Sequence, residues 1–356
     1  MSGLSKKMMQ AAAGAGGDKL IAYVGSSGRI TSMDISNPSD LSELGSFSSS
    51  NIGSAFDVAL DLANQVAYVA TFGGDSITSI DISNPSDLSE LDSYTSSNLE
   101  NSTAVALDTV NQVAYVVCSA VAFAASRITS IDISNPSAMS EIDSFNSGNL
   151  EGAEDIALDL ANQVAYVASP DEECITSIDI SNPSDLSELD SYTSSNLVVA
   201  SRLALDLTNQ VAYVGAAGST RTITSIDISN PSAMSELGSY GSFGPQGIAL
   251  DLTNEVAYVC KTNDDVEAVD ISNPSAMSRL GIFTSANFTQ SQDIVLDLTN
   301  QVAYVVCDQD DRITAIDISN PLEMSELGGY TSANLNSARS IALNSVEDSA
   351  STNAYE

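Results

Sequence analysis

The sequence predicts an all-β fold, a seven-bladed β-propeller built from four-stranded antiparallel blades. Three observations lead to this prediction. One short string recurs seven times, each recurrence has room for four short strands, and the two ends of the sequence supply complementary parts of one blade. Four strands in a repeat of this length are typical of propellers, and the longer patterns of helical repeat proteins are absent from the sequence.

The recurring string is Asp-Ile-Ser-Asn-Pro, and successive copies start 43 to 51 residues apart. Its aspartates are Asp34, Asp81, Asp132, Asp179, Asp227, Asp270 and Asp317. A second string, of the type LDLTNQVAYV, precedes six copies, with tyrosines Tyr68, Tyr115, Tyr166, Tyr213, Tyr258 and Tyr304. A seventh tyrosine, Tyr23, stands in a shortened copy without the leading half. This spacing indicates seven copies of one supersecondary unit.

The fourth copy shows how each unit divides into four strands, A to D. These are expected at residues 154–159, 164–169, 174–180 and 188–194. We expect strands A and B to be joined by a tight turn in which Asn162 takes a positive φ. Pro183 cannot donate to a sheet and marks the end of strand C, and residues 184–187 are expected to form one helical turn.

The two ends of the array complete each other. The first copy, from Leu20 to about Phe47, lacks strand A, whereas Ser340–Asn344 repeat a strand A without the rest of a blade. Pairing this C-terminal strand with the strand of Tyr23 would close the ring and remove the exposed edges of an open array. The expected organisation is a leader at 1–18, one propeller domain at 19–344 and an acidic tail at 345–356.

The blade pattern resembles that of the LVIVD-repeat propellers, whose blades carry strings of the type YVAD, IIDISNP and LGSY. The resemblance covers residues 19–344 and depends on the seven copies of DISNP. It implies the propeller fold but no activity, because the family is mostly uncharacterised. Members of the family are found on surface and secreted proteins.

The first 17 residues differ in chemistry from the remainder, because they contain Lys6 and Lys7 and no acidic residue. They resemble the short leaders, lysine followed by alanine and glycine, of marine phage structural and appendage proteins. This resemblance implies a virion protein that contacts other virion proteins through residues 1–17; the alternative is a disordered tail. The sequence has no recognisable signal peptide and no run of about 20 apolar residues that would span a membrane.

The composition excludes several classes of function. Acidic residues outnumber basic residues 47 to 11, and the net charge of −36 repels nucleic acids and anionic lipids. Histidine, the commonest general base and metal ligand, does not occur. The four cysteines are expected to be small buried side chains, because they fall in different blades, too far apart for disulfides: Cys118, Cys174, Cys260 and Cys307.

The two ends of the propeller are expected to differ. The A–B turns and the C–D connections hardly change between copies, and strand direction places both at one end, called here the uniform end. The B–C and D–A loops change in every copy and form the opposite, variable end. Residues 77–99 and 175–197 are identical, for example, but their flanking loops are not. Varied loops on a rigid scaffold favour recognition at the variable end, although unconstrained drift would produce the same pattern.

Four candidate contact residues at the variable end are apolar. Val121 and Phe123 lie in the longest B–C loop, and Leu197 and Val198 lie in the D–A loop that follows blade 4. Exposed apolar loops often mark contacts with other proteins. The alternative for the first loop is that it folds over its own blade. The expected partner is a protein or a cell-surface glycan.

Acidic B–C loops are candidate Ca²⁺ ligands, because Ca²⁺ prefers six to eight oxygen ligands. The candidates are Asp171, Glu172, Glu173, Asp308, Asp310 and Asp311. Their spacing matches no known Ca²⁺ motif. A solvated acidic surface is therefore the favoured interpretation, and no cofactor is expected.

The last candidates lie at the mouth of the central channel. Asp57, Asp155, Arg202 and Asp293 occupy one equivalent position at the start of strand A. Mixed charge there would hold a small ligand or simply solvate the channel. In contrast, the aspartates that end each strand A and those of DISNP are expected to cap backbone N–H groups at turns.

The sequence favours a binding protein over an enzyme. It offers no nucleophile with a neighbouring base, no phosphate-binding glycine loop and no His/Cys metal cluster. A glycosidase-type carboxylate pair across the channel, such as Asp155 with Asp293, is the enzymatic alternative. The favoured function is a virion-associated propeller that displays its variable end for recognition or adhesion. The second interpretation is a secreted or cell-surface bacterial adhesion module.

Overall fold

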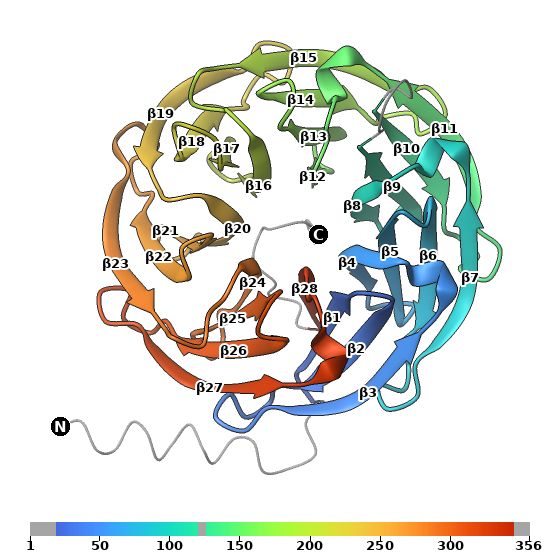
Figure 1. Cartoon of the computed structure of the whole chain (residues 1–356). Coiled ribbons are helices and arrows are strands. Elements are labelled where there is room, and N and C mark those ends of the chain that lie inside the picture. Colours follow the sequence, from blue (N-terminus) through green and yellow to red (C-terminus); the bar gives the residue numbers. More distant parts are fainter. Residues whose placement is uncertain (1–18, 120–125, 345–356) are drawn as a thin grey trace.

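A computed structural model describes residues 19–119 and 126–344, and its strands form seven four-stranded sheets around a central axis (Figure 1). Each sheet is one antiparallel blade, with strand A at the axis and strand D at the rim. Blade 1 consists of β28 (Ser340–Leu343), β1 (Ile21–Ser26), β2 (Arg29–Asp34) and β3 (Ser42–Ser48). Blade 2 consists of β4 (Ser54–Asp61), β5 (Val66–Phe72), β6 (Ser76–Asp81) and β7 (Ser89–Thr95).

The next three blades follow the same order. Blade 3 consists of β8 (Ser102–Asp108), β9 (Val113–Cys118), β10 (Arg127–Asp132) and β11 (Ser140–Asn146). Blade 4 consists of β12 (Asp155–Asp159), β13 (Val164–Ser169), β14 (Cys174–Asp179) and β15 (Ser187–Thr193). Blade 5 consists of β16 (Ala200–Asp206), β17 (Val211–Ala216), β18 (Thr222–Asp227) and β19 (Ser235–Gly241).

The last two blades complete the ring. Blade 6 consists of β20 (Pro245–Asp251), β21 (Val256–Lys261), β22 (Asp265–Asp270) and β23 (Ser278–Thr284), and blade 7 of β24 (Ser291–Asp297), β25 (Val302–Cys307), β26 (Arg312–Asp317) and β27 (Ser325–Thr331). Short 3-10 turns are η1 (Ser50–Ile52), η2 (Ser97–Leu99), η3 (Gly148–Leu150), η4 (Pro274–Ala276) and η5 (Ala333–Leu335). None of the helices in the described residues is long and apolar enough to cross a membrane.

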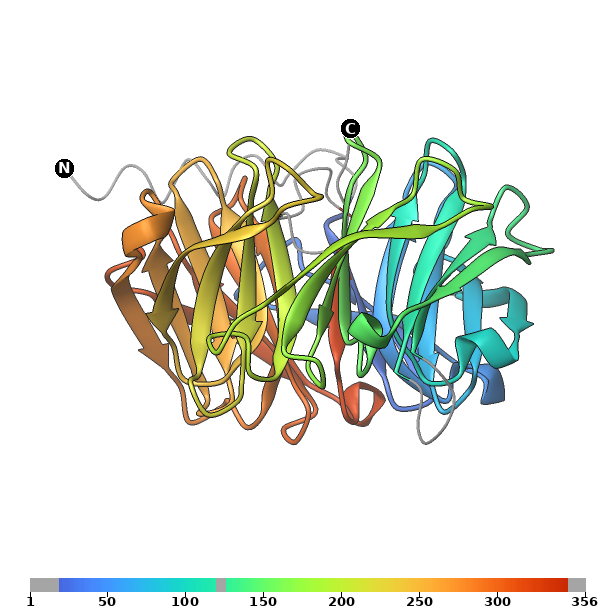
Figure 2. The same cartoon turned by 90° about the horizontal axis from the view of Figure 1, so that it is seen from above.

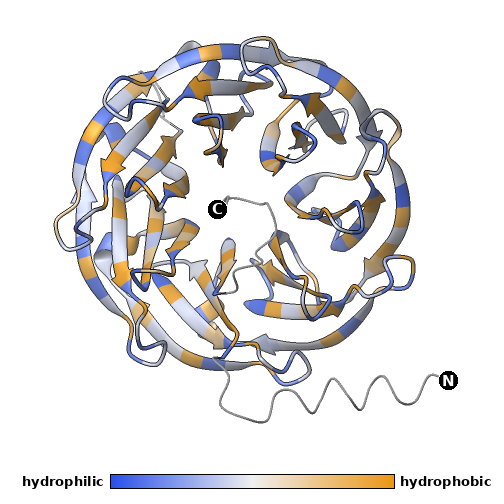
Figure 3. Cartoon of the chain, turned by 180° about the vertical axis from the view of Figure 1, so that it is seen from behind, coloured by the Kyte–Doolittle hydropathy of each residue, from blue (hydrophilic) through white to orange (hydrophobic). Residues whose placement is uncertain are grey.

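Burial falls from the axis to the rim. Every residue of the inner strand β13 is buried, whereas the rim strand β15 is half-buried, with both of its ends exposed. Hydrophilic and hydrophobic residues alternate along the rim strands (Figure 3), as is typical of strands with one face toward solvent. The core lies between blades, where apolar side chains of neighbouring sheets interdigitate, and all four cysteines are free and buried, as predicted.

The A–B turns are capped as predicted, but the residue with positive φ is not the expected one. In blade 4, the Asp159 carboxylate accepts the Asn162 backbone N–H at 3.0 Å and its side-chain N–H at 2.8 Å. These two bonds hold Asn162 in place, and the next residue, Gln163, takes the left-handed conformation with φ of 57°. The prediction of a positive φ at Asn162 was therefore wrong.

The DISNP segments form turns at the end of strand C. The Asp179 carboxylate accepts the Ser181 N–H at 2.9 Å, which confirms the predicted cap. The Asp185 N–H then donates to the Asn182 carbonyl at 2.9 Å. This is a turn and not the helical turn expected at residues 184–187, although the equivalent segment of blade 6 forms the 3-10 turn η4.

Loops connect the strands at both ends of the ring (Figure 2), and each end holds the predicted classes of loop. At the uniform end, A–B turns and C–D connections meet, since the Ile180 N–H donates to the Gln163 carbonyl at 3.0 Å. At the variable end, D–A and B–C loops meet, since the Ser96 N–H donates to the Asp75 carbonyl at 3.2 Å.

Neighbouring blades are joined by bonds that repeat around the ring. In six of the seven blades, the buried tyrosine of strand B donates its hydroxyl to the isoleucine carbonyl of DISNP in the next blade, as Tyr166 does to Ile228 at 3.4 Å; the Tyr68 hydroxyl has no partner in the described chain. The rim strands follow one another around the circumference (Figure 1). A glutamate at the start of each of six rim strands accepts bonds from the preceding blade, as Glu188 does from Ser147 and Asn149 at 2.5 and 2.7 Å.

The C-terminal strand closes the ring as predicted. β28 pairs antiparallel with β1, with Tyr23 opposite Ala342, and so completes blade 1. The joint between blades 7 and 1 has the same bonds as the others. Tyr304 donates to the Ile35 carbonyl at 3.1 Å, and Glu43 accepts from Asn334 at 2.6 Å.

Candidate functional site at the channel mouth

The starts of the A strands gather polar side chains around the channel at the variable end. A cavity of about 60 Å³ lies there, lined by residues from all seven blades. Its lining includes the four channel residues singled out from the sequence, Asp57, Asp155, Arg202 and Asp293. The structure therefore brings these four together, although they are far apart in the chain.

Each of the three aspartates joins two blades through backbone hydrogen bonds. One carboxylate oxygen accepts the N–H of the following residue, and the other accepts the equivalent N–H of the next blade. The donors are Val58 and Val105 for Asp57, Ile156 and Leu203 for Asp155, and Ile294 and Ile341 for Asp293, at 2.8–3.0 Å. Both oxygens of every channel aspartate are therefore used in holding blades together.

Three aspartates serve six of the seven equivalent N–H groups of the ring. The seventh belongs to Ile248, whose position opposite Val259 matches that of Val58 opposite Val69. In the described chain no aspartate reaches it. At the position equivalent to Asp57, called here the ring position, its own blade has Gly247 and the preceding blade has Arg202. Gly247 allows blades 6 and 7 to approach closely, since a Cβ there would lie 3.0 Å from the Cα of Asp293.

Burial dominates the electrostatics of the channel carboxyls. It raises the pKa of Asp57 to about 6, that of Asp293 to about 7 and that of Asp155 to about 8. The Arg202 guanidinium and the backbone N–H donors oppose this rise. Removing water from a carboxylate disfavours its charged form, and in this channel the loss of water outweighs the compensating bonds.

Arg202 links blades 5 and 6 at the position equivalent to that of the three channel aspartates. Its Nε donates to the Gln246 carbonyl and one of its terminal nitrogens donates to the Ser201 carbonyl at 2.6 Å. The same nitrogen lies 3.4 Å from the Glu154 carboxylate, so the guanidinium also reaches blade 4. Arg202 thus has a structural role and also brings positive charge to the cavity.

An aromatic platform borders the cavity. The rings of Phe56 and Phe72 stack with centroids 4.9 Å apart and planes at 25°. The Arg339 guanidinium lies over the Phe56 ring, 4.7 Å from its centroid, and 3.7 Å from the Asp308 carboxylate. Phe72 is exposed and Phe56 is half-buried. The faces of the Phe56 ring are thus taken by Phe72 and Arg339, and the exposed Phe72 ring provides the apolar surface next to charged and polar groups.

Two buried polar atoms of the cavity lining have no hydrogen-bond partner in the described chain. They are the hydroxyl oxygen of Ser340, a residue that is 3% exposed, and Nε of Arg339. Leaving a buried donor without a partner costs about 1–3 kcal/mol. Such groups are typical of positions that water or a ligand completes.

The apolar candidates, unlike the channel residues, are not brought together at one site in the described chain. Leu197 is fully buried and packs in the core between blades 4 and 5, so its assignment to a contact surface was wrong. It occupies the same place as Ile52, Leu99 and Leu150, which anchor the other D–A loops. Val198 is half-buried, and its carbonyl accepts the Gly218 N–H at 2.9 Å. Val121 and Phe123 lie outside the described residues.

The acidic candidates do not converge. No three carboxylates or cysteines of the described chain are placed to hold a metal ion. Asp171, Glu172 and Glu173 are exposed side by side on one loop, and Asp308, Asp310 and Asp311 lie on another. Glu173 and Asp311 instead take left-handed backbone conformations that end their B–C loops, with φ of 53° and 49°.

The residue that precedes each ring position was not predicted as part of the site. This position differs in nearly every blade and holds Phe56, Thr103, Glu154, Ser201, Gln246, Gln292 and Arg339. Five of the seven line the cavity. The sequence did contain a signal for this part of the site. The residue at this position varies between copies, as do the loops of the variable end.

Comparison with known proteins agrees with the fold. The LVIVD-repeat family model matches seven segments, at residues 21–49, 52–96, 121–147, 155–194, 212–242, 252–285 and 300–332. No curated protein matches the sequence.

Solved structures share the architecture at low identity. A protein from Lactobacillus plantarum is 15% identical, with a TM-score of 0.77 over 92% of this chain and 99% of its own. A functionally unknown protein from Desulfotomaculum acetoxidans is 13% identical, with a TM-score of 0.76 over 91% and 98%. The periplasmic gluconolactonase of Pseudomonas aeruginosa is 9% identical, with a TM-score of 0.75 over 92% and 100%. These likenesses concern the fold alone.

Proposed function

The chain belongs to the LVIVD-repeat family, and we propose that it is a non-enzymatic recognition protein that binds the end of a neutral glycan at its channel mouth. The observation that carries the proposal is the aromatic platform beside unpartnered polar groups. Phe56 and Phe72 present a flat face, and Ser340 and Arg339 offer buried donors a short way along the same lining.

The size of the cavity favours binding of a terminal group. About 60 Å³ is room for a few water molecules, whereas pockets for whole small molecules measure about 300–1,000 Å³. A ligand would therefore insert one or two hydroxyl groups and rest the remainder on the exposed Phe72 ring, which stacks on Phe56. Hydroxyl groups both donate and accept, which suits a lining that mixes Arg202, Glu154 and Gln292.

The overall charge favours a neutral ligand. A net charge of −36 repels anions before they reach the surface. Within the cavity lining, four carboxyl groups face two guanidinium groups, so the site has no excess of positive charge to reverse that repulsion. Neutral sugars are not subject to this electrostatic repulsion.

The use of the channel carboxylates disfavours catalysis. A general acid or base must turn a carboxyl oxygen toward the substrate. Each oxygen of Asp57, Asp155 and Asp293 already accepts a backbone N–H, so turning the carboxyl toward a substrate would break bonds that hold the blades together. We therefore expect the chain not to hydrolyse gluconolactone, the substrate in the name of the Pseudomonas relative. Hydrolysis faster than in buffer, and lost in Asp155→Asn, would make the protein an enzyme.

The binding test is a panel of neutral oligosaccharides presented to the full-length protein. For any glycan that binds, Phe56→Ala should weaken the affinity by about 2 kcal/mol, or about thirtyfold, because it removes the central ring of the platform. The matched control is Phe243→Ala, which removes an exposed ring under Arg221 that lies outside the cavity lining. Equal losses from the two variants would contradict a site at the channel mouth.

Display on a virion is part of the same proposal, with a secreted or cell-surface adhesion protein as the alternative. Its support is the resemblance of the leader to those of phage structural proteins. Mass spectrometry of purified particles and of culture supernatant separates the two settings. Detection only as a free protein would argue against carriage on a virion.

A further inference from the structure

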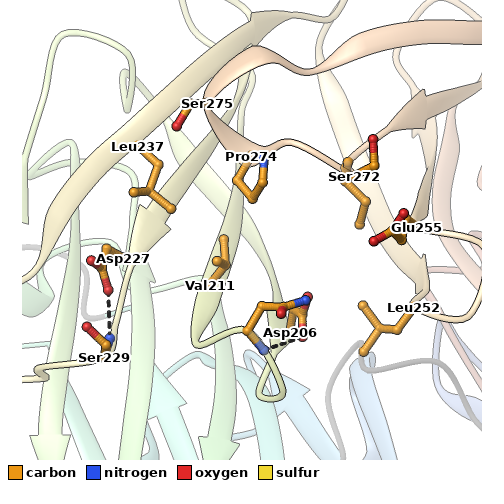
Figure 4. A pocket seen from close by; sticks show the side chains of 12 residues that line it. Asp206, Val211, Asp227, Ser229, Leu237, Leu252, Glu255, Ser272, Pro274 and Ser275 are labelled. Carbon is orange, nitrogen blue, oxygen red and sulfur yellow. Dashed lines mark hydrogen bonds between the residues drawn. The ribbon is translucent and has the colours of Figure 1, made fainter.

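A groove at the uniform end, between blades 5 and 6, is a second candidate binding site. It has a volume of about 470 Å³ and lies at the opposite end of the ring from the channel mouth. A–B turn residues form one side, and C–D connections form the other (Figure 4). Its size is within the range of small-ligand pockets.

The groove combines negative charge with apolar walls. Asp227 and Glu255 lie on opposite sides of the space, with Val211 and Pro274 between them, and Asp206 lies below (Figure 4). Leu237 and Leu252 add further apolar surface, and among the described residues no lysine or arginine lines it. Burial raises the pKa of the neighbouring Tyr213 hydroxyl, and the charges of Asp206 and Glu255 raise it further.

Glu255 departs from the repeat at this joint. The other five A–B turns have glutamine here: Gln65, Gln112, Gln163, Gln210 and Gln301. Gln112 and Gln210 accept a bond from the asparagine of the preceding turn, at 3.1 and 3.3 Å. In the described chain Glu255 makes no such bond to Asn209. Its φ of 55° equals that of Gln65, so the difference lies in charge and not in backbone conformation.

The remaining acidic groups of the groove are partly occupied. Asp206 uses both oxygens to hold Asn209, at 2.9 and 2.7 Å. Asp227 uses one oxygen for the Ser229 N–H at 2.9 Å. The second oxygen of Asp227 and the exposed carboxylate of Glu255 therefore remain as acceptors on the two sides of the groove. This arrangement suits an ammonium group on an aliphatic stem, with the stem against the apolar wall.

We propose that Lys6 or Lys7 of this chain docks in the groove between blades 5 and 6, with its ammonium group against the exposed Glu255 carboxylate or, on the other side of the groove, against Asp227. The chain enters the ring at the same end, where the Leu20 N–H donates to the Ser36 hydroxyl at 3.0 Å and Lys19 pairs with Asp34 at 2.6 Å. The first 17 residues contain two lysines and no acid, so they are complementary to this groove.

The length of chain before Lys19 is sufficient. Extended chain spans about 3.3 Å per residue, so the twelve residues from Lys7 to Lys19 reach about 40 Å. A chain of this size has a radius of gyration of about 20 Å, and the groove lies at the same end of the molecule. Docking there would hold the leader against the uniform end and leave the channel mouth open, so the inference does not depend on the proposed glycan site.

The test is zero-length carbodiimide coupling of the full-length protein, which joins an ammonium group only to a carboxylate in contact with it. We expect peptides that link Lys6 or Lys7 to Glu255 or Asp227. In Glu255→Gln, total coupling of these lysines to the groove should fall about fivefold, since one ion pair and its attachment point are lost. Five other turns tolerate glutamine, so this variant keeps the fold. Gln65→Glu is the matched control and should acquire no link.

A second measurement uses a synthetic peptide of residues 1–17 added to the full-length Lys6→Gln/Lys7→Gln protein. The wild-type peptide should bind, and Glu255→Gln in the protein should weaken binding about fivefold. Coupling spread over the acidic surface and unchanged in Glu255→Gln would overturn the proposal. In mixed isotope-labelled samples, links formed only between different copies would overturn docking within one chain.

Discussion

At the scale of single residues, the acidic side chains serve three structural roles in addition to giving the protein its charge. Asp159 caps an A–B turn, Asp155 joins two blades at the channel, and Glu188 joins two blades at the rim. In each case a carboxylate accepts hydrogen bonds that a neutral side chain of similar size would lose in part. Much of the negative charge is therefore tied to backbone and side-chain donors, which explains how an ordered fold tolerates it.

The channel ring makes a prediction about pH. The pKa of Asp155 is about 8 in the folded chain, above the value of about 3.9 for an unfolded chain. The folded state therefore binds more protons between these values, so this contribution to stability is present below about pH 4 and is lost as the pH rises through 8. In Asp155→Asn, the free energy of unfolding should fall less between pH 5 and pH 9 than in the wild type.

Urea unfolding at several pH values measures this difference. Asp185→Asn, in an exposed C–D connection, controls for the loss of one negative charge and should retain the wild-type slope. Identical slopes for all three proteins would show that Asp155 does not titrate as the channel geometry implies.

At the scale of elements, six of the seven D–A loops of the described chain are anchored by a buried apolar residue, and only the loop after blade 5 lacks one, because its Phe243 is exposed. Leu197 has this role after blade 4, and Leu99 and Leu335 have it after blades 2 and 7. The loop can vary around such an anchor without disturbing the core, which is why variable sequence and fixed packing coexist in one segment. Leu197 therefore stabilises the fold, and the variable residues of the loop lie next to it.

Substitution separates the two adjacent residues of that loop. Leu197→Ala should lower the free energy of unfolding by about 2–5 kcal/mol, because it leaves a cavity between blades 4 and 5. Val198→Ala, at a half-buried position, should cost about 1 kcal/mol or less. Chemical denaturation of both variants measures this contrast. A Leu197→Ala protein as stable as the wild type, and impaired only in binding, would restore Leu197 to the contact surface.

The elements were predictable from the sequence because every one of them recurs. The expected strand B of blade 4 agrees with the structure, and the other three strands differ from it by one residue at their ends. The position of positive φ was less accessible, since nothing in the repeated string ranks Gln163 above Asn162 until the Asp159 cap is seen to hold the asparagine. The platform of Phe56 and Phe72 was hidden for a related reason, because the stack joins two strands whose side chains the repeat pattern alone does not orient.

At the scale of the whole molecule, the ring closes within a blade and not between blades. β28 brings the last residues of the described chain into the sheet of the first, so the joint between blades 7 and 1 keeps the repeated bonds. The joint between blades 5 and 6 departs from the repeat at two positions, where Arg279 replaces the rim glutamate and Glu255 replaces the glutamine of the A–B turn. Closure and the irregular joint thus lie in different parts of the ring, and the groove does not result from the way the chain ends meet.

Closure within blade 1 predicts opposite results for two truncations. Removing residues 340–356 deletes β28, exposes the edge of β1 and leaves Asp293 without the Ile341 N–H. Losing the buried Ile341 and Leu343 side chains alone should cost about 5 kcal/mol, and the bare edge should promote aggregation. Removing only residues 345–356 keeps β28 and should leave the melting temperature nearly unchanged. Calorimetry and light scattering compare the two proteins.

A synthetic peptide of residues 338–346 should restore the melting temperature of the longer truncation in a concentration-dependent manner, because it binds only the folded ring. Equal melting of both truncations, with no response to the peptide, would mean that β28 does not hold the propeller closed.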